Sequence, residues 1–189
     1  NEYSVPDPES LYGRSKLAGE KAALSHQAAI VIRTSWLYSS FGANFVKTIL
    51  KKAKEKESLN VVFDQVGTPT YAADLAKAVM TIIAGVIRNQ IAFIPGIYHY
   101  SNEGVCSWYD FAQAVVEEAE INCRIIPILS AQYPTVAKRP AWSVLDKGRI
   151  KLTLALVKGK KLYDKRAKLK EIDNEREIER DLKHLGMVK

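Results

Sequence analysis

Cysteine is scarce in this chain of 189 residues, which contains only Cys106 and Cys123. Both lie in apolar stretches, "EGVCSW" and "INCRII", and they lack the close spacing of metal ligands. Disulfide-scaffold and zinc-binding domains usually carry more cysteines at set spacings. We therefore interpret the two as structural thiols rather than as a disulfide or a redox pair.

Long hydrophobic runs are also missing. No stretch approaches the roughly 18 consecutive apolar residues that a membrane-spanning helix needs. The first residues, "NEYSVPDPES", have neither the basic nor the apolar part of a signal peptide. We therefore expect a cytoplasmic protein with no membrane partner.

An excess of charge of either sign is nearly absent from residues 1–148, which carry 15 Lys and Arg against 14 Asp and Glu. Residues 149–189 carry 13 against 7, so this segment holds +6 of the net charge of +7. Overall, 47% of residues are hydrophobic and 26% are charged, as in ordinary globular proteins. We expect one domain over 1–148 and a separate basic segment over 149–189.

Short apolar runs alternate with helical patterns along the first 148 residues. The predicted helices are 11–26, with Ser10 as N-cap, 44–57, 72–88, and 107–120, with Ser107 as N-cap. The predicted strands are 28–36, 59–63, 96–101 and 123–128, and the predicted loops are 64–74 and 130–146. This alternation indicates an α/β fold with a largely parallel sheet.

Tyr12 and Lys16 stand four residues apart in the first predicted helix, "LYGRSKLAGE". This spacing places both side chains on one helix face. A nearby ammonium favours the phenolate of a tyrosine, so such a phenol can donate its proton to a carbonyl that receives a hydride. From spacing alone, two interpretations stay open: a catalytic pair, or two side chains that share the surface of an amphipathic helix.

Five stretches follow one another along the chain: "PESLYGRSKLAGE", "IRTSWLYSSFGANFVKTIL", "VVFDQVGTPTYAADLA", "GIYHYSNEGVCSWYDFA" and "YPTVAKRPAWSVLD". Together they resemble the dTDP-4-dehydrorhamnose reductases of the extended short-chain dehydrogenase class. The resemblance runs over about residues 5–150. It implies the C-terminal part of a Rossmann-like parallel-sheet reductase with its small substrate-binding subdomain.

The resemblance also implies a reaction and its residues. The reaction is reduction of the 4-keto group of a dTDP-sugar by NADPH or NADH, in a family-typical homodimer. Tyr12 is the implied proton donor, Lys16 its partner and ribose ligand, and Arg33 and Thr34 lie near the nicotinamide. On the substrate side we place Trp36, Gln65 and Arg139, whose guanidinium suits a diphosphate. Four other polar residues are interpreted as caps, surface groups or satisfied side chains: His26, His99, Glu103 and Asp110.

A glycine-rich turn that holds the cofactor pyrophosphate is part of this family's pattern. None of the ten glycines here forms G-x-G-x-x-G or a relaxed form of it. The family's catalytic Ser or Thr upstream of the tyrosine is not found either. We therefore expect a C-terminal half that lacks most of the cofactor site, binds nicotinamide nucleotide poorly and turns over negligibly on its own.

The segment from Arg149 differs in character from the rest. "RIKLTLALVKG" alternates like a strand, and "KKLYDKRAKLKEIDNEREIERDLKHLG" is typical of a charged helix. The word "GKKLYDKR" followed by a charged helix resembles the C-terminal tail of the SsrA-binding protein, small protein B, of bacterial ribosome rescue. The fold expected here is a strand followed by that helix.

That second resemblance implies contact with transfer-messenger RNA or the ribosome. Basic side chains of the segment suit phosphate contacts; they are Lys160, Lys161, Lys165 and Arg166. A solvated charged helix is the alternative interpretation. The leading functional hypothesis is thus a reductase-derived protein joined near Arg149 to this tail, and the alternative is an RNA- or ribosome-binding protein that acts through the tail.

Overall fold

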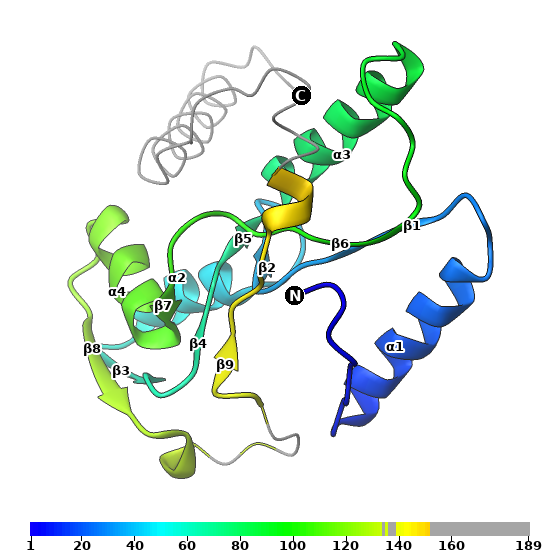
Figure 1. Ribbon diagram of the computed structural model, residues 1–189. Helices are drawn as coiled ribbons and strands as arrows, with labels where there is room; N and C mark the ends of the chain where they lie inside the picture. The colour runs from blue at the N-terminus through cyan, green and yellow to red at the C-terminus, as the bar shows by residue number, and fades with distance from the viewer. Residues whose placement is uncertain (134, 136–138, 152–189) are drawn as a thin grey trace, which may run out of the picture.

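The computed structural model describes residues 1–133, 135 and 139–151 (Figure 1). Its helices are α1 (Leu11–Leu24), α2 (Phe45–Glu55), α3 (Ala72–Ile87), α4 (Trp108–Glu118) and the short 3-10 helix η1 (Ser130–Gln132). Its longer strands are β1 (Ile30–Arg33), β3 (Ser58–Val62), β6 (Gly96–His99) and β8 (Arg124–Ile128). Five two-residue strands complete it: β2 (Leu37–Tyr38), β4 (Val66–Gly67), β5 (Thr70–Tyr71), β7 (Cys106–Ser107) and β9 (Trp142–Ser143).

Strand pairing is almost entirely parallel. β1 pairs with β6, β2 with β5, and β3 with β8, each in parallel. β4 lies between β7, which is antiparallel to it, and β9, which is parallel. Parallel neighbours joined through helices are the mark of an α/β fold, so the predicted fold class is confirmed.

Two helices begin where their capping serines predict. The Ser10 hydroxyl accepts a hydrogen bond from the Gly13 N–H at 3.0 Å, which opens α1. Ser107 and Asp110 form a reciprocal capping box at the start of α4. Each cap satisfies backbone N–H groups that have no partner inside the helix. Asp110 is therefore a cap, as expected.

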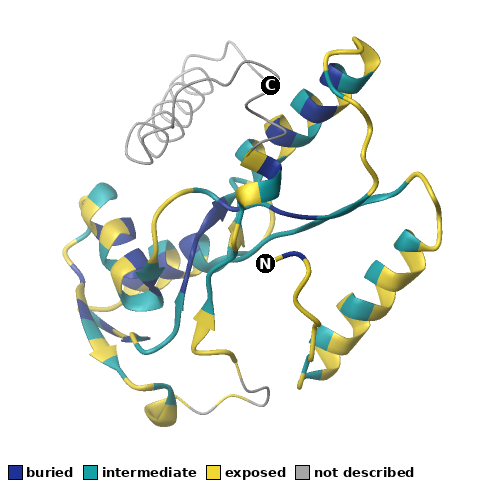
Figure 2. Ribbon diagram, in the orientation of Figure 1, coloured by how far each residue is buried: buried dark blue, intermediate teal, exposed yellow. Residues whose placement is uncertain are grey.

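The larger core cluster lies where α2 and α4 pack on β3 and β8. It contains Ile49 of α2, Val115 of α4, and Leu59 and Ile125 of the two strands, all buried (Figure 2). A smaller cluster joins Ile82 of α3, Tyr98 of β6 and Ile150. The larger cluster supports the cavity described below, because α2, α4 and β3 also supply residues of the cavity wall.

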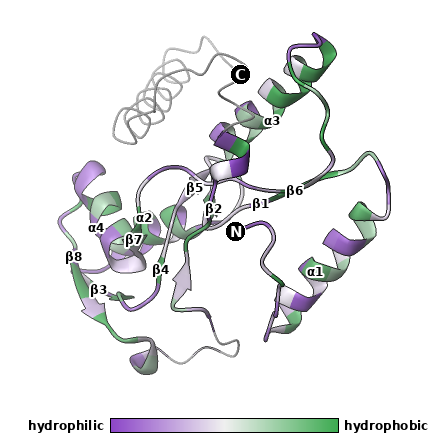
Figure 3. Cartoon of the chain, in the orientation of Figure 1, coloured by the Kyte–Doolittle hydropathy of each residue, from purple (hydrophilic) through white to green (hydrophobic). Residues whose placement is uncertain are grey.

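Helix α1 packs much less closely than the other helices. None of its residues is buried, and hydrophobic and hydrophilic side chains alternate around it (Figures 2 and 3). Leu11 and Tyr12 are 76% and 71% exposed. The side of α1 that carries the predicted catalytic pair is therefore open to solvent in the described part of the chain.

The segment that the sequence predicts as a strand from Arg149 starts differently. Residues 148–151 form a helical turn, because Ile150 is buried against Ile82 and Tyr98 and the Arg149 guanidinium donates to the Ile97 carbonyl at 2.9 Å. The rest of the predicted strand and the charged helix lie outside the described residues. Among the residues that are described, no helix is both long and apolar enough to cross a membrane.

Candidate active site

The predicted catalytic pair lies on the first turns of α1. The Lys16 ammonium nitrogen is 5.3 Å from the centroid of the Tyr12 ring, and both side chains are exposed. Their four-residue spacing on a helix produces this proximity. The pair is thus assembled by local structure alone, and its phenol and ammonium are accessible to a ligand.

Arg33, the last residue of β1, binds α1 through Glu20. Its Nη2 and Nε atoms donate to the two carboxylate oxygens of Glu20 at 2.6 and 2.8 Å. The hydrogen bonds with Arg33 lower the pKa of Glu20 below its ordinary value, and those with Glu20 raise the pKa of Arg33. Both groups are therefore charged. This planar, two-point geometry ties the helix of the predicted catalytic pair to the parallel strands.

His99 of β6 adjoins this ion pair as a neutral ring. The Arg33 Nη1 atom lies 3.4 Å from His99 Nε2, and His99 Nδ1 lies 3.0 Å from the Asp146 carbonyl oxygen. Arginine can only donate and a carbonyl can only accept, so Nε2 is the acceptor and Nδ1 carries the proton. Burial lowers the pKa of His99, although nearby Glu2 opposes this. His99 is a satisfied polar residue, as expected.

Thr34 follows Arg33 at the carboxyl end of β1. Its hydroxyl oxygen is buried and has no hydrogen-bond partner within the described residues. Buried hydroxyls without partners are uncommon in native proteins. The position assigned to Thr34 near the nicotinamide therefore has a buried polar atom whose hydrogen-bonding capacity the described residues do not use.

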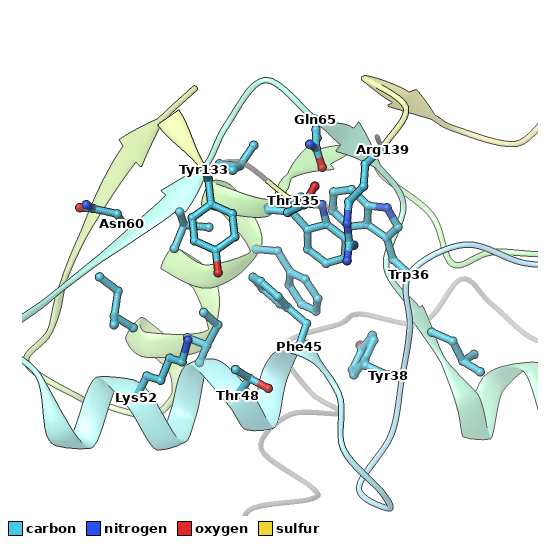
Figure 4. A pocket seen from close by; sticks show the side chains of 17 residues that line it. Trp36, Tyr38, Phe45, Thr48, Lys52, Asn60, Gln65, Tyr133, Thr135 and Arg139 are labelled. Atoms are coloured by element: carbon cyan, nitrogen blue, oxygen red, sulfur yellow. The ribbon is translucent and has the colours of Figure 1, made fainter. Parts of the chain in front are cut away.

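A cavity of about 470 Å³ lies between α2, α4, β3 and the loops that follow β3 and β8. The three residues that the sequence places on the substrate side, Trp36, Gln65 and Arg139, all line it (Figure 4). They come from segments up to about a hundred positions apart. The fold thus brings together, at one cavity, the three residues that the sequence resemblance assigns to the substrate side.

One wall of the cavity is aromatic. Trp36 and Trp108 stack with their ring centroids 3.5 Å apart and their planes 8° from parallel. Phe45 of α2 lies 4.6 Å from Trp108, between centroids. Trp36 itself has a φ of +47°, an unusual backbone conformation for a bulky residue. The Trp36 ring therefore stacks on Trp108 from a residue whose own backbone is strained.

The rest of the cavity lining includes polar and positively charged side chains. Gln65, Thr135 and Arg139 reach into it from the loops, and Thr48 and Lys52 face it from α2 (Figure 4). No acidic side chain lines the cavity among the described residues. Two cations beside an aromatic wall suit a ligand that carries both an anionic group and flat or apolar surfaces.

Tyr38 also lines the cavity. Burial raises its pKa to about 12, with a smaller contribution from Asp74. Its phenol is therefore neutral at physiological pH and can donate a hydrogen bond. Unlike Tyr12, it packs against Phe111 of the core.

Several lining residues carry no signal that identifies them from the sequence. In the sequence, Lys52 belongs to the lysine-rich face of the helix predicted over 44–57, and no substrate role is predicted for Trp108. Neither Tyr12 nor Lys16 lines the cavity. The predicted RNA-contacting residues Lys160, Lys161, Lys165 and Arg166 lie outside the described residues. The described part of the chain holds no cluster of three or more side chains suited to a metal ion.

Comparison with known proteins identifies sequences that are similar to this chain. The profile of the RmlD substrate binding domain matches residues 1–174. The spore coat polysaccharide biosynthesis protein SpsK of Bacillus subtilis is 45% identical over 141 residues, which are 74% of this chain and 47% of that protein. A dTDP-4-dehydrorhamnose reductase of Aggregatibacter actinomycetemcomitans is 42% identical over 156 residues, covering 79% of this chain and 53% of the relative.

Solved structures agree with the sequence relatives. The dTDP-4-dehydrorhamnose reductase of Bacillus anthracis, in complex with NADP, is 39% identical and superposes with a TM-score of 0.70 over 80% of this chain and 51% of its own. A dTDP-4-dehydrorhamnose reductase of Clostridium acetobutylicum, an RfbD orthologue, is 37% identical, with a TM-score of 0.77 over 93% of this chain and 59% of its own. The chain spans about half the length of the curated relatives it matches. It belongs to the RmlD substrate-binding domain family.

Proposed function

We propose that this chain is the substrate-binding part of a dTDP-4-dehydrorhamnose reductase and that its cavity takes the dTDP-linked sugar. The observation that carries this proposal is the cavity itself, whose lining combines the cations Arg139 and Lys52 with the Trp36–Trp108 stack. Two cations suit a diphosphate, and indole faces suit a sugar ring or a base. Family membership supplies the identity of the nucleotide sugar as dTDP-linked.

The proposed reaction is reduction of the 4-keto group of the sugar to a hydroxyl. The carbonyl carbon receives a hydride, and its oxygen takes a proton from the Tyr12 phenol. Because Tyr12 does not line the cavity, the keto end of the sugar would extend beyond it toward α1. The Lys16 ammonium, 5.3 Å from the Tyr12 ring, stabilises the phenolate that remains. Arg33 and Glu20 hold the helix that carries both residues against β1.

The cofactor that the family implies is NADPH or NADH, which supplies the hydride when bound. The residues described here fit its nicotinamide and ribose end. Thr34 offers a buried hydroxyl without a partner, and Lys16 offers an exposed ammonium beside Tyr12. Thr34 would contact the nicotinamide end, and Lys16 would donate to ribose hydroxyls. A glycine-rich turn for the pyrophosphate is not among the motifs of this sequence.

Calorimetric titration with dTDP-L-rhamnose, the reaction product, tests the substrate site directly without requiring turnover. We expect saturable binding, and Arg139→Ala or Lys52→Ala should each weaken it about tenfold or more, because each removes a charged donor to phosphate. Lys51→Ala is the matched control, since Lys51 is exposed on the same helix and does not line the cavity. Failure of the unmodified chain to bind dTDP-L-rhamnose or dTDP would refute the proposed function.

A separate proposal concerns residues 152–189, which lie outside the described residues. We propose, from the "GKKLYDKR" word and the net charge of +6 over 149–189, that this segment makes weak, salt-sensitive contacts with transfer-messenger RNA or the ribosome. Deletion of residues 158–189 should abolish RNA binding in a gel-shift titration. If the truncated chain bound RNA as tightly as the full chain, the proposed role of this segment would be wrong. The homodimer and the cytoplasmic location likewise stay predictions.

A further inference from the structure

The amide of Gln65 is held by a short hydrogen-bond relay at the carboxyl ends of two paired strands. β3 and β8 run in parallel, with Val62 opposite Ile128. Asp64 and Gln65 follow β3, and Ser130 follows β8 as the first residue of η1. Residues 65 positions apart in the chain therefore meet at one edge of the cavity.

Asp64 anchors the relay. The Ser130 hydroxyl donates to Asp64 Oδ1 at 2.7 Å, and the Ser130 N–H donates to the same oxygen at 2.9 Å. The Gln65 Nε2 atom lies 2.8 Å from the Ser130 hydroxyl oxygen. All three residues are partly buried, so water competes less for these bonds than it would at an open surface.

The chemistry of the three groups determines which way the amide points. An ionised carboxylate can only accept, so the single hydroxyl proton of Ser130 is committed to Asp64. The Ser130 oxygen can then only accept a further bond, so the Gln65 atom facing it must be the NH₂ group. The carbonyl oxygen Oε1 therefore points away from Ser130, and Figure 4 shows it on the cavity side of the amide. Within the described residues it accepts no hydrogen bond.

We propose that the Asp64–Ser130 relay makes Gln65 a fixed hydrogen-bond acceptor in the cavity, which recognises an O–H or N–H donor of the bound nucleotide sugar. The two cations, Lys52 and Arg139, offer donors, and Gln65 Oε1 complements them as an oriented acceptor. Asp64 and Ser130 are thus positioning residues, and Gln65 is the residue that determines specificity. This proposal rests on the proposed function, because it assumes that a nucleotide sugar occupies the cavity.

The geometry is tested without ligand by nuclear magnetic resonance. The side-chain NH₂ signals of Gln65, assigned by their loss in Gln65→Met, should shift in Ser130→Ala. Ser143→Ala is the matched control, because its hydroxyl also bonds a neighbouring group, the Val66 carbonyl, but does not touch Gln65. Unchanged Gln65 signals in Ser130→Ala would overturn the relay whether or not the cavity binds a nucleotide sugar.

The recognition step is tested by a double-mutant cycle with dTDP-L-rhamnose and with dTDP. We expect Ser130→Ala and Gln65→Met each to weaken binding about 5–10-fold, the worth of about one hydrogen bond, and the double variant to bind as Gln65→Met does. The proposal would be overturned if the double variant bound about 5–10-fold more weakly than Gln65→Met. It would also be overturned if Ser130→Ala bound as tightly as the unmodified chain. If the two substitutions are non-additive in dTDP binding, the donor that Gln65 recognises lies on the nucleotide. If they are non-additive only in dTDP-L-rhamnose binding, the donor is a sugar hydroxyl.

Failure of the two proposals can be told apart. If the unmodified chain binds neither dTDP nor dTDP-L-rhamnose, the proposed function fails, and the recognition proposal fails with it. If the unmodified chain binds both but the cycle shows no coupling, only the role of Gln65 fails. Ser143→Ala should retain the affinity of the unmodified chain in either ligand series.

Discussion

Arg33 and Glu20 form a two-point ion pair that joins the end of β1 to α1. The bonds measure 2.6 and 2.8 Å, and the side chains are only 22% and 12% exposed. Because α1 has no buried residue of its own, this pair is a principal polar attachment of the helix that carries Tyr12 and Lys16. A role for Arg33 in holding the helix is compatible with its predicted position near the nicotinamide, which stays a prediction.

Replacing Glu20 with Gln should loosen α1. The substitution keeps the shape of the side chain but removes its charge, and a hydrogen bond to a charged group contributes about 1.5–3 kcal/mol to stability. We expect a loss of about 1–3 kcal/mol in the free energy of unfolding, measured by urea denaturation, with faster amide hydrogen exchange in α1. Glu55→Gln, at an exposed site that ends α2, is the control and should change neither.

Acid should destabilise the protein in two separate ranges of pH. Burial keeps the pKa of His99 below 6.5, so the unfolded chain takes up this proton first and stability falls as the pH drops from about 6.5. The pKa of Glu20 is held below 4.5, chiefly by its hydrogen bonds with Arg33. Its contribution is therefore present above 4.5 and is lost at lower pH, as the pH falls through the folded pKa.

Thermal unfolding measured between pH 7.5 and 5 isolates the histidine. His99→Gln keeps a side chain that can donate to the Asp146 carbonyl and accept from Arg33, but it does not titrate. We expect its melting temperature to change less with pH over this range than that of the unmodified chain. The Glu2 carboxylate, which accepts from the His99 backbone N–H at 3.4 Å, is present in both proteins, so the difference between them reports on the His99 ring. An identical pH dependence in both proteins would exclude His99 as the cause.

Local chemistry made much of this fold predictable. Ser10 and Ser107 indicate where α1 and α4 begin, because a serine hydroxyl caps free N–H groups at whichever helix follows it. The two-residue strands β4, β5 and β9 fall in segments predicted as loops. They are too short for a pattern of alternation, and they form only because distant partners, such as β7 for β4, supply their hydrogen bonds.

The candidate site was predictable only in part, for a related reason. Motifs that resemble a family pointed to Trp36, Gln65 and Arg139, and these line one cavity. The relay from Asp64 through Ser130 depends on the register of β3 against β8, which no short motif encodes. Lys52 could not be told apart from the neighbouring lysines in the sequence. Its side chain lines the cavity because of how α2 packs, which the neighbouring residues do not indicate.

The Trp36–Trp108 stack gives the cavity a spectroscopic signal of its own. Two indoles 3.5 Å apart should couple electronically and produce a paired positive and negative band in far-ultraviolet circular dichroism. Trp36→Phe and Trp108→Phe should each abolish this band pair. Trp142→Phe should leave it intact, because Trp142 is 65% exposed in β9 and has no stacking partner among the described rings. A band pair that survives in Trp36→Phe would contradict the stacked geometry.

Gly67 should be necessary for the position of the Trp36 ring, because a side chain there has no room. A Cβ atom at Gly67 would lie 2.5 Å from Cε2 and 2.7 Å from Nε1 of the Trp36 indole, and 2.6 Å from the Ser143 hydroxyl oxygen. The backbone cannot easily retreat, since β4 is the central strand between β7 and β9 and the neighbouring Thr70 N–H bonds the Trp36 carbonyl at 3.0 Å. In Gly67→Ala the indole must therefore move, at a cost of about 1–3 kcal/mol for overpacking.

Gly67→Ala should weaken the circular-dichroism band pair and reduce affinity for dTDP-L-rhamnose, while the chain stays folded. Gly19→Ala is the matched control. A Cβ atom there meets nothing within 4 Å, and alanine in a helix is favoured over glycine by about 0.5–1 kcal/mol, so this variant should gain stability and keep the band pair. Gly67→Ala should lower stability and Gly19→Ala should raise it. This difference separates a steric effect on Trp36 from any general effect of replacing glycine with alanine. A folded Gly67→Ala protein with an undiminished band pair would show that the indole tolerates the methyl group and does not depend on Gly67.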